Sequence, residues 1–208
     1  MRFLAILFLM VVLAVLPVAA QGQEKKTTIT GWPPYMFGAD LNTIMQANST
    51  LKRECVVNGQ RTRERAGWLC AQGKVDAPIA GRNYSATLFL EFINDRLEMV
   101  MLMWTFDALM SRVNAKGALD GELRANYADE MRRGTQDAPM DFKKQFLGPL
   151  LNFRVDESAV SLTFWVDAQG NALMIVDAMG QPSLLLIYAS AKGTGNTSPP
   201  PPPPPAKY

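Results

Sequence analysis

Histidine is absent from the 208 residues of this chain. Histidine is the usual general base beside a catalytic nucleophile, and its imidazole is the commonest metal ligand. Its absence therefore excludes Ser-His-Asp and Cys-His nucleophile systems and every zinc site that needs an imidazole. The chain also has no cofactor-binding motif. We expect a non-enzymatic protein without a cofactor or a metal.

An excess of charge of either sign is also lacking. The chain has 21 basic and 19 acidic residues, a net charge of +2, and the two signs are interspersed along it. Proteins that bind nucleic acids or anionic membranes usually gather basic residues on one face. The sequence therefore gives no reason to expect either partner.

Cysteine is scarce, with Cys55 and Cys70 as the only pair. A redox pair is typically arranged as Cys-x-x-Cys, which this spacing does not provide. In an oxidising compartment an even pair at this separation predicts one structural disulfide rather than a redox or metal role. Closing such a loop contributes about 3 kcal/mol to stability in the chain-entropy treatment.

The N-terminus has the order of a signal peptide. Arg2 supplies one positive charge, residues 3–16 are apolar without interruption, and Pro17 and small residues follow. We predict cleavage after Ala20 and a periplasmic or secreted mature protein. The alternative is an uncleaved anchor, because residues 3–20 carry no charge and approach the length that spans a bilayer. No other stretch is long and apolar enough to span a membrane.

Composition divides the rest of the chain into three parts. Residues 21–34 form a polar leader segment, and residues 35–190 form an α+β domain. Residues 191–208 are predicted to be a disordered tail that contains seven consecutive prolines, at positions 199–205. Such a run adopts the extended polyproline helix and serves as a spacer or a docking peptide.

An aromatic pair flanks two prolines before the domain, in the order Trp32-Pro33-Pro34-Tyr35. Each proline fixes its own φ and keeps the preceding residue out of the helical region, so the segment is expected to be rigid and extended. Trp32 and Tyr35 are either a recognition element or a lid on the edge of the core.

Apolar residues at helical spacing predict several helices. The first follows a cap at Asp40, and a short one lies near residues 142–146. Two more are expected over residues 105–117 and 120–133, each ending at a glycine. The inward face of the first of these two is predicted to consist of Phe106, Leu109, Met110 and Val113.

The clearest strand signal is a hairpin over residues 86–104, with Asn94-Asp95 at its turn. Two short strands are expected around residues 54–57 and 68–71. Three more runs, at residues 160–166, 172–176 and 184–189, are joined by connections too short for crossovers, so they predict an antiparallel meander.

The register of the hairpin bears on function. A two-residue turn pairs Phe92 with Leu97, Leu90 with Met99 and Leu88 with Met101. The same register sets Glu91 opposite Glu98. Two such close carboxylates raise one pKa and form the acid/base pair of a glycosidase, or else they are bridged by a basic residue on a solvated sheet face.

The order of Phe37-Gly38 before a short helix, two cysteines, and a hairpin with Asn94-Asp95-Arg96-Leu97 at its tip resembles the repeat unit of bacterial envelope proteins of the β-lactamase-inhibitor-protein-like and BamE-like type. The resemblance covers residues 35–104. Gly38-Ala39 replaces the Gly-Met of those units, and Asp95 stands in place of a glycine. The resemblance implies short helices packed on an antiparallel sheet, in a periplasmic binding or assembly module without catalysis. Residues 105–190 are either part of the same core or a second such unit.

Three functions are consistent with these residues. The leading hypothesis is an exported, non-catalytic protein that binds another envelope component, either a protein or the cell wall, through an exposed sheet face or the segment of Trp32 and Tyr35. The first alternative is a glycan hydrolase that uses Glu91 and Glu98. The second is a structural spacer that relies on the polyproline tail.

Overall fold

The structure is a computed structural model that describes residues 24–53, 56–57, 60–61, 68–143, 147 and 159–193. The predicted signal peptide, its cleavage junction, Cys55 and the polyproline run lie outside these residues. The predictions made for them therefore stay predictions.

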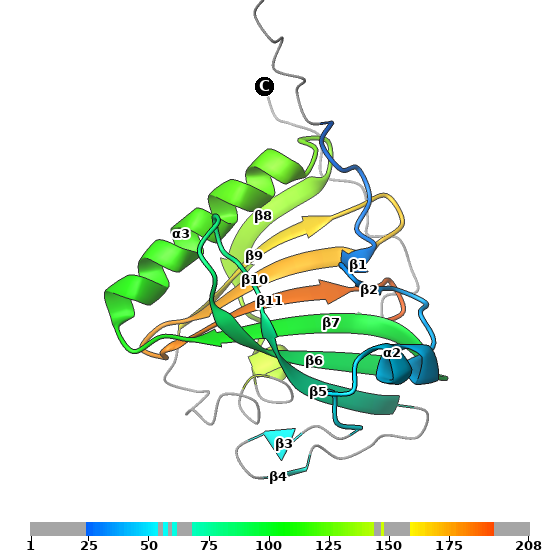
Figure 1. The fold of residues 1–208 in the computed structure, drawn as a ribbon. Helices are drawn as coiled ribbons and strands as arrows, with labels where there is room; N and C mark the ends of the chain where they lie inside the picture. Colours follow the sequence, from blue (N-terminus) through cyan, green and yellow to red (C-terminus); the bar gives the residue numbers. More distant parts are fainter. Residues whose placement is uncertain are drawn as a thin grey trace, which may run out of the picture.

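The described chain is built around one antiparallel seven-stranded sheet (Figure 1). Its strands lie side by side in the order β5-β6-β7-β11-β10-β9-β8. In that order they are β5 (Trp68–Asp76), β6 (Ser85–Ile93), β7 (Arg96–Thr105), β11 (Ser183–Ala189), β10 (Ala172–Ala178), β9 (Val160–Val166) and β8 (Arg132–Asp137). The strand runs before and after the long helix therefore join in one sheet, where β7 pairs with β11.

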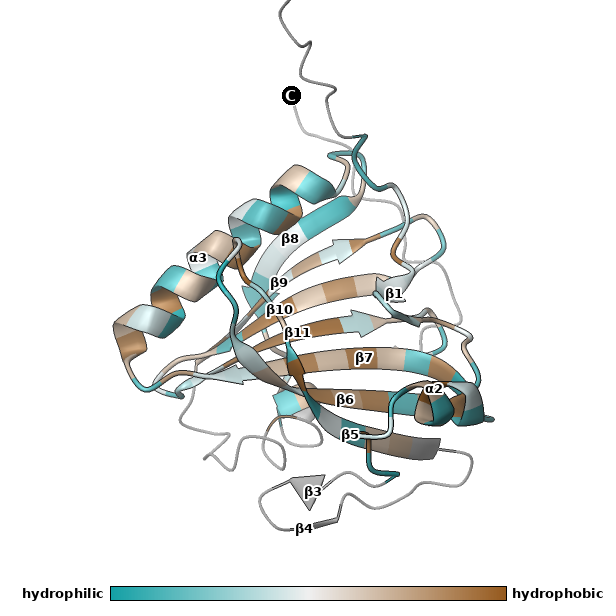
Figure 2. Ribbon diagram, viewed as in Figure 1, coloured by the Kyte–Doolittle hydropathy of each residue, from teal (hydrophilic) through white to brown (hydrophobic). Residues whose placement is uncertain are grey.

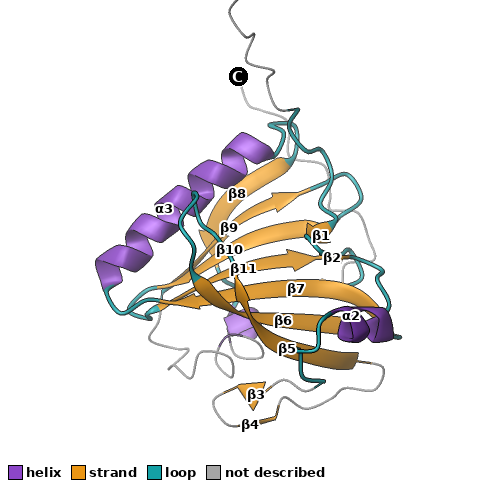
Figure 3. Ribbon diagram, viewed as in Figure 1, coloured by secondary structure: helices purple, strands orange, loops and turns teal. Residues whose placement is uncertain are grey.

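Helices cover the sheet, as the α+β prediction requires (Figure 3). The long helix α3 (Leu109–Asn126) crosses one face of the sheet. Near the other end of that face lie the two-stranded β1 (Gly31–Trp32) and β2 (Tyr35–Met36), and the short helix α2 (Leu41–Ala47). The remaining elements are β3 (Val56–Val57), β4 (Gln60–Arg61) and α4 (Met140–Phe142).

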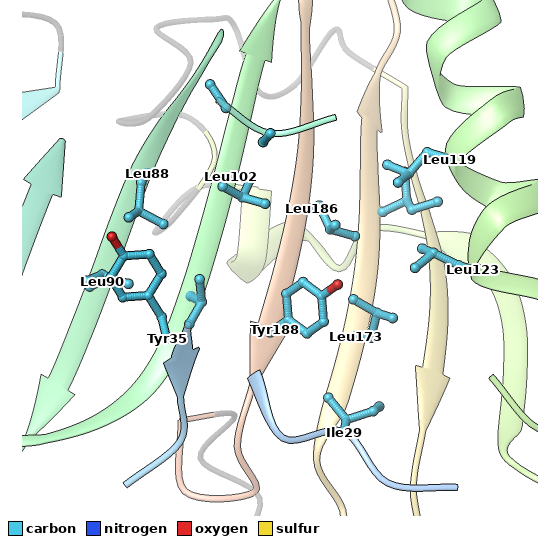
Figure 4. Packing of buried hydrophobic residues seen from close by; sticks show 14 of the residues in the cluster. Ile29, Tyr35, Leu88, Leu90, Leu102, Leu119, Leu123, Leu173, Leu186 and Tyr188 are labelled. Atoms are coloured by element: carbon cyan, nitrogen blue, oxygen red, sulfur yellow. The ribbon is translucent and has the colours of Figure 1, made fainter. Parts of the chain in front are cut away.

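The main core lies between the sheet and these covering elements. Figure 4 shows leucines of β6, β7, β11 and β10 along the sheet, with Leu119 and Leu123 of α3 beside Leu173 of β10, and Tyr35 beside Leu90 of β6. A second apolar cluster on β6, β7, β9, β10 and β11 includes Phe89, Met101 and Leu185. Because apolar residues are buried on both faces, the central strands are almost continuously hydrophobic (Figure 2).

The predicted hairpin and meander are confirmed. Asn94 and Asp95 both have positive φ, at 52° and 61°, as a two-residue hairpin turn of the primed type requires. The meander strands β9, β10 and β11 pair antiparallel in chain order. Helix α2 also begins as predicted, because the Asp40 carboxylate accepts hydrogen bonds from the Asn42 and Thr43 N–H groups.

The predicted hairpin register is correct only at the turn. Phe92 pairs with Leu97, but a β-bulge then shifts the strands, so that Glu91 faces Met99 and Leu90 faces Val100. Glu98 is the extra residue of the bulge. Both faces of this hairpin are buried, so the alternation of apolar and polar residues carries too little information to fix the register.

The prediction of two helices over residues 105–117 and 120–133 is wrong. One helix, α3, runs through Gly117 and ends at Asn126, and Arg132 and Arg133 begin strand β8. A glycine inside a helix costs only about 1 kcal/mol, which the packing of α3 on the sheet offsets. The predicted inward face is also wrong, because α3 buries Arg112, Ala115, Leu119 and Leu123 instead.

Candidate functional site

The segment of Trp32 and Tyr35 forms a tight hairpin rather than an extended lead into the domain. Trp32 and Tyr35 pair across β1 and β2, and their rings stack with centroids 6.0 Å apart. Tyr35 is only 6% exposed, and its hydroxyl accepts a hydrogen bond of 2.7 Å from the Asn48 side chain. Tyr35 therefore packs in the core, whereas Trp32 is half-buried and the two prolines are exposed. The structure leaves Trp32 as the aromatic group of the segment that a partner can reach.

The two carboxylates proposed as an acid/base pair do not face each other. Glu91 is half-buried opposite Met99, whereas Glu98 sits in the bulge and is buried. The Ser190 hydroxyl donates to the Glu98 carboxylate, and the Ser190 N–H donates to the Glu98 carbonyl at 2.8 Å. The Glu98 side chain therefore ties the bulge to the end of β11, and the register that suggested glycoside hydrolysis is absent.

Cys70 lies on β5 and is half-buried. Its predicted partner Cys55 is outside the described residues, so the disulfide stays a prediction.

A buried ion cluster fastens the start of α3 to the sheet. The Arg112 guanidinium donates to one oxygen of Asp177 on β10 and reaches the Ala178 carbonyl at 3.5 Å. The Lys116 ammonium donates to the other Asp177 oxygen at 2.7 Å. Burial lowers the pKa of Arg112, and burial followed by the Arg112 charge lowers the pKa of Lys116. The cluster fixes which side of α3 faces the sheet.

Because Arg112 points inward, its apolar neighbours point outward. Leu109, Met110 and Val113 are 57%, 66% and 46% exposed, and Met179 in the turn after β10 is 64% exposed. Figure 1 shows the first turn of α3 beside the connection between β10 and β11, and a hydrogen bond of 3.0 Å from the Phe106 N–H to the Pro182 carbonyl joins the two loops. These four residues are named the α3 patch. Single exposed apolar residues are common on proteins, whereas a contiguous group marks an interaction surface.

A tyrosine pair occupies the other end of α3. Tyr127 and Tyr188 of β11 are both buried and hydrogen-bonded to each other. Burial raises the pKa of both phenols, so both stay neutral and serve as hydrogen-bonding groups of the core. The Lys26 ammonium of the N-terminal segment lies over the Tyr127 ring, 5.8 Å from its centre.

The described part of the chain contains no group of three or more His, Cys, Asp or Glu side chains arranged to hold a metal ion. Within the same residues, no helix combines the length and the apolar character needed to cross a membrane.

Comparison with protein-family models, with curated proteins and with solved structures found no match to this chain. The resemblance to bacterial envelope proteins therefore stays a prediction from the sequence.

Sequence reasoning missed the α3 patch because it placed Leu109, Met110 and Val113 in the core. The signal that was available is the pair Arg112 and Lys116, four residues apart on the opposite side of the helix from Met110. The sequence had no way to show that this basic side faces Asp177, a residue of a strand far along the chain.

Proposed function

We propose that this protein is a non-catalytic binding protein that works outside the cytosol and binds another envelope protein through the α3 patch. The single observation that carries the proposal is the exposure of Leu109, Met110 and Val113 at the start of α3 together with Met179 in the neighbouring turn after β10. Burial of apolar side chains is the main favourable term in protein association. The signal-peptide pattern of residues 1–20 supports the extracytoplasmic location.

The partner that this surface fits is a protein rather than a glycan. Polysaccharide surfaces are mostly hydroxyl groups, which gain little from contact with leucine, methionine and valine side chains. Met110 and Met179 are unbranched, so they adapt to the shape of a protein partner. Trp32 is a second candidate contact, since its side chain is only half-buried where it packs against the core.

The experiment is site-specific photo-crosslinking in the native host. A photoreactive residue at position 110 should give one discrete adduct, whereas the same residue at Ala125, an exposed position near the other end of α3, should give none. The protein in the adduct is then purified and titrated with the purified chain.

We expect Met110→Glu to weaken that measured affinity by at least tenfold, because it places a charge in an apolar contact. Ala125→Glu, with the same added charge on the same helix, should leave the affinity unchanged. Equal crosslinking at both positions, or equal affinity of the two variants, would reject the α3 patch as the binding surface.

A further inference from the structure

Strand β8 forms one edge of the seven-stranded sheet, and among the described residues it pairs only with β9. Every residue of β8 except the half-buried Gly134 is exposed, on both faces of the strand. At the opposite edge, Lys52 forms a bridge to Gln72 of β5 through backbone hydrogen bonds of 2.8 and 2.9 Å. In the part of the chain that the structure describes, the edge at β8 is therefore the more open of the two.

The hydrogen-bond pattern shows which groups of β8 point outward. The Ala138 N–H donates to the Val160 carbonyl at 2.8 Å, which places the even-numbered residues of β8 in the bonded pairs with β9. The N–H and carbonyl groups of Arg133, Thr135 and Asp137 consequently point away from the sheet. Within the described residues these groups have no backbone partner.

The three outward residues also share one face of the sheet and carry complementary charges. Arg133 and Asp137 lie on either side of Thr135, at equal separations along the strand. Neither side chain has an ion-pair partner in the described part of its own chain. A strand with opposite charges placed symmetrically about its centre is complementary to an antiparallel copy of itself.

We propose that two copies of this protein form a dimer by antiparallel pairing of their β8 strands about a two-fold axis at Thr135. Thr135 then faces Thr135 of the second copy, and Arg133 faces its Asp137 at both ends of the strand pair. The outward N–H and carbonyl groups of all three residues are satisfied by hydrogen bonds between the chains. The two sheets become one continuous sheet with an α3 helix from each copy.

Other symmetric registers fit less well. Centring the axis on Arg133 or on Asp137 sets two like charges against each other, which destabilises a strand pair. Centring it on Gln136 sets Arg133 opposite Pro139, which has no N–H to donate. Centring it on Gly134 sets Asp137 opposite Met131 and leaves the charges unpaired.

The test is a charge exchange, measured by analytical ultracentrifugation of the purified full chain. Arg133→Asp and Asp137→Arg should each raise the dissociation constant of the dimer about tenfold or more, because each single change sets like charges opposite each other twice. The double variant Arg133→Asp, Asp137→Arg should restore the original affinity. Within one strand these residues are four positions apart and do not contact, so rescue requires pairing between chains.

Two further variants serve as controls. Asp76→Arg makes the same charge change at an exposed residue of β5, at the opposite edge, and should leave the dimer unchanged. Thr135→Pro removes an outward N–H that β9 does not use, so it should give a folded monomer, with folding checked by circular dichroism. A wild-type chain that is monomeric up to its solubility limit overturns the proposal. A dimer that is insensitive to the single exchanges, or not restored by the double exchange, overturns it equally.

Discussion

Asp177 is the residue on which the position of α3 depends most. Its carboxylate accepts hydrogen bonds from both Arg112 and Lys116, and Arg112 is almost fully buried. Removing one partner of a buried ion pair leaves the other charged and desolvated, which typically costs 3–5 kcal/mol. The cluster holds α3 in the orientation that exposes the α3 patch.

We therefore expect Asp177→Ala to lower the free energy of unfolding by about 3–5 kcal/mol, measured by urea denaturation. Asp129→Ala is the matched control, since Asp129 pairs with Lys25 at 3.1 Å and both side chains are exposed. That surface pair should contribute no more than about 0.5 kcal/mol. Similar losses in the two variants would mean that the buried cluster does not anchor α3.

Individual site residues were only partly predictable from the sequence. The sequence left Tyr35 as either a recognition element or part of a lid on the edge of the core; the ring is buried, and its hydroxyl has Asn48 as a partner. The prediction that Glu91 faces Glu98 is wrong because a one-residue bulge shifts the strand register. Where both faces of a strand are apolar, the sequence pattern does not reveal such a bulge. The local sequence shows which residues are apolar, but it does not show which residues they contact in the fold.

At the scale of elements, α3 carries two glycines that its packing does not require. A Cβ atom added to Gly117 or Gly121 would meet no atom within 4 Å. By contrast, a Cβ at Gly31, which has a φ of +110°, would lie 2.4 Å from the Tyr35 carbonyl oxygen. The helix glycines are therefore replaceable, whereas Gly31 is required by its backbone conformation.

Gly117→Ala and Gly121→Ala should each raise the free energy of unfolding by roughly 0.5–1 kcal/mol, because alanine loses less backbone entropy in a helix. Gly31→Ala should lower it by more than about 1 kcal/mol. Chemical denaturation of the three variants under identical conditions checks both signs. A loss of stability at Gly117 or Gly121 would show that something packs on the outer side of α3 in the free protein.

The strands were more predictable than the helices. The turn at Asn94-Asp95 and the short meander connections are local signals, and local geometry suffices to make them. Strand β8 was missed because its residues are all polar or glycine and lie at an edge, where no apolar alternation is needed. The extent of α3 was missed because contacts with the sheet, rather than helix propensity, set its ends.

For the whole molecule, the sequence predicts an antiparallel sheet with helices but not how its parts join. The joining pair is β7 with β11, in which Met99 faces Ala189 and Thr105 faces Ser183. Nothing local in either strand specifies such a partner, because both are nearly uniformly apolar. The α+β class follows from the spacing of apolar residues along the sequence. The pairing of β7 with β11, called the seam below, instead depends on how the apolar side chains of the two strands pack in the folded protein.

The seam implies that the strands before and after α3 unfold together. Leu88 of β6 and Leu173 of β10 are both fully buried, and they belong to the same core cluster. Leu88→Ala and Leu173→Ala should each cost about 2–5 kcal/mol, and each variant should still unfold in a single transition. Scanning calorimetry tests this, with equality of the calorimetric and van't Hoff enthalpies as the criterion.

The control is Met179→Ala, at an exposed position, which should change the free energy of unfolding by less than about 0.5 kcal/mol. If residues 35–104 and 105–190 were separate units, two transitions would appear and each leucine variant would shift only one of them.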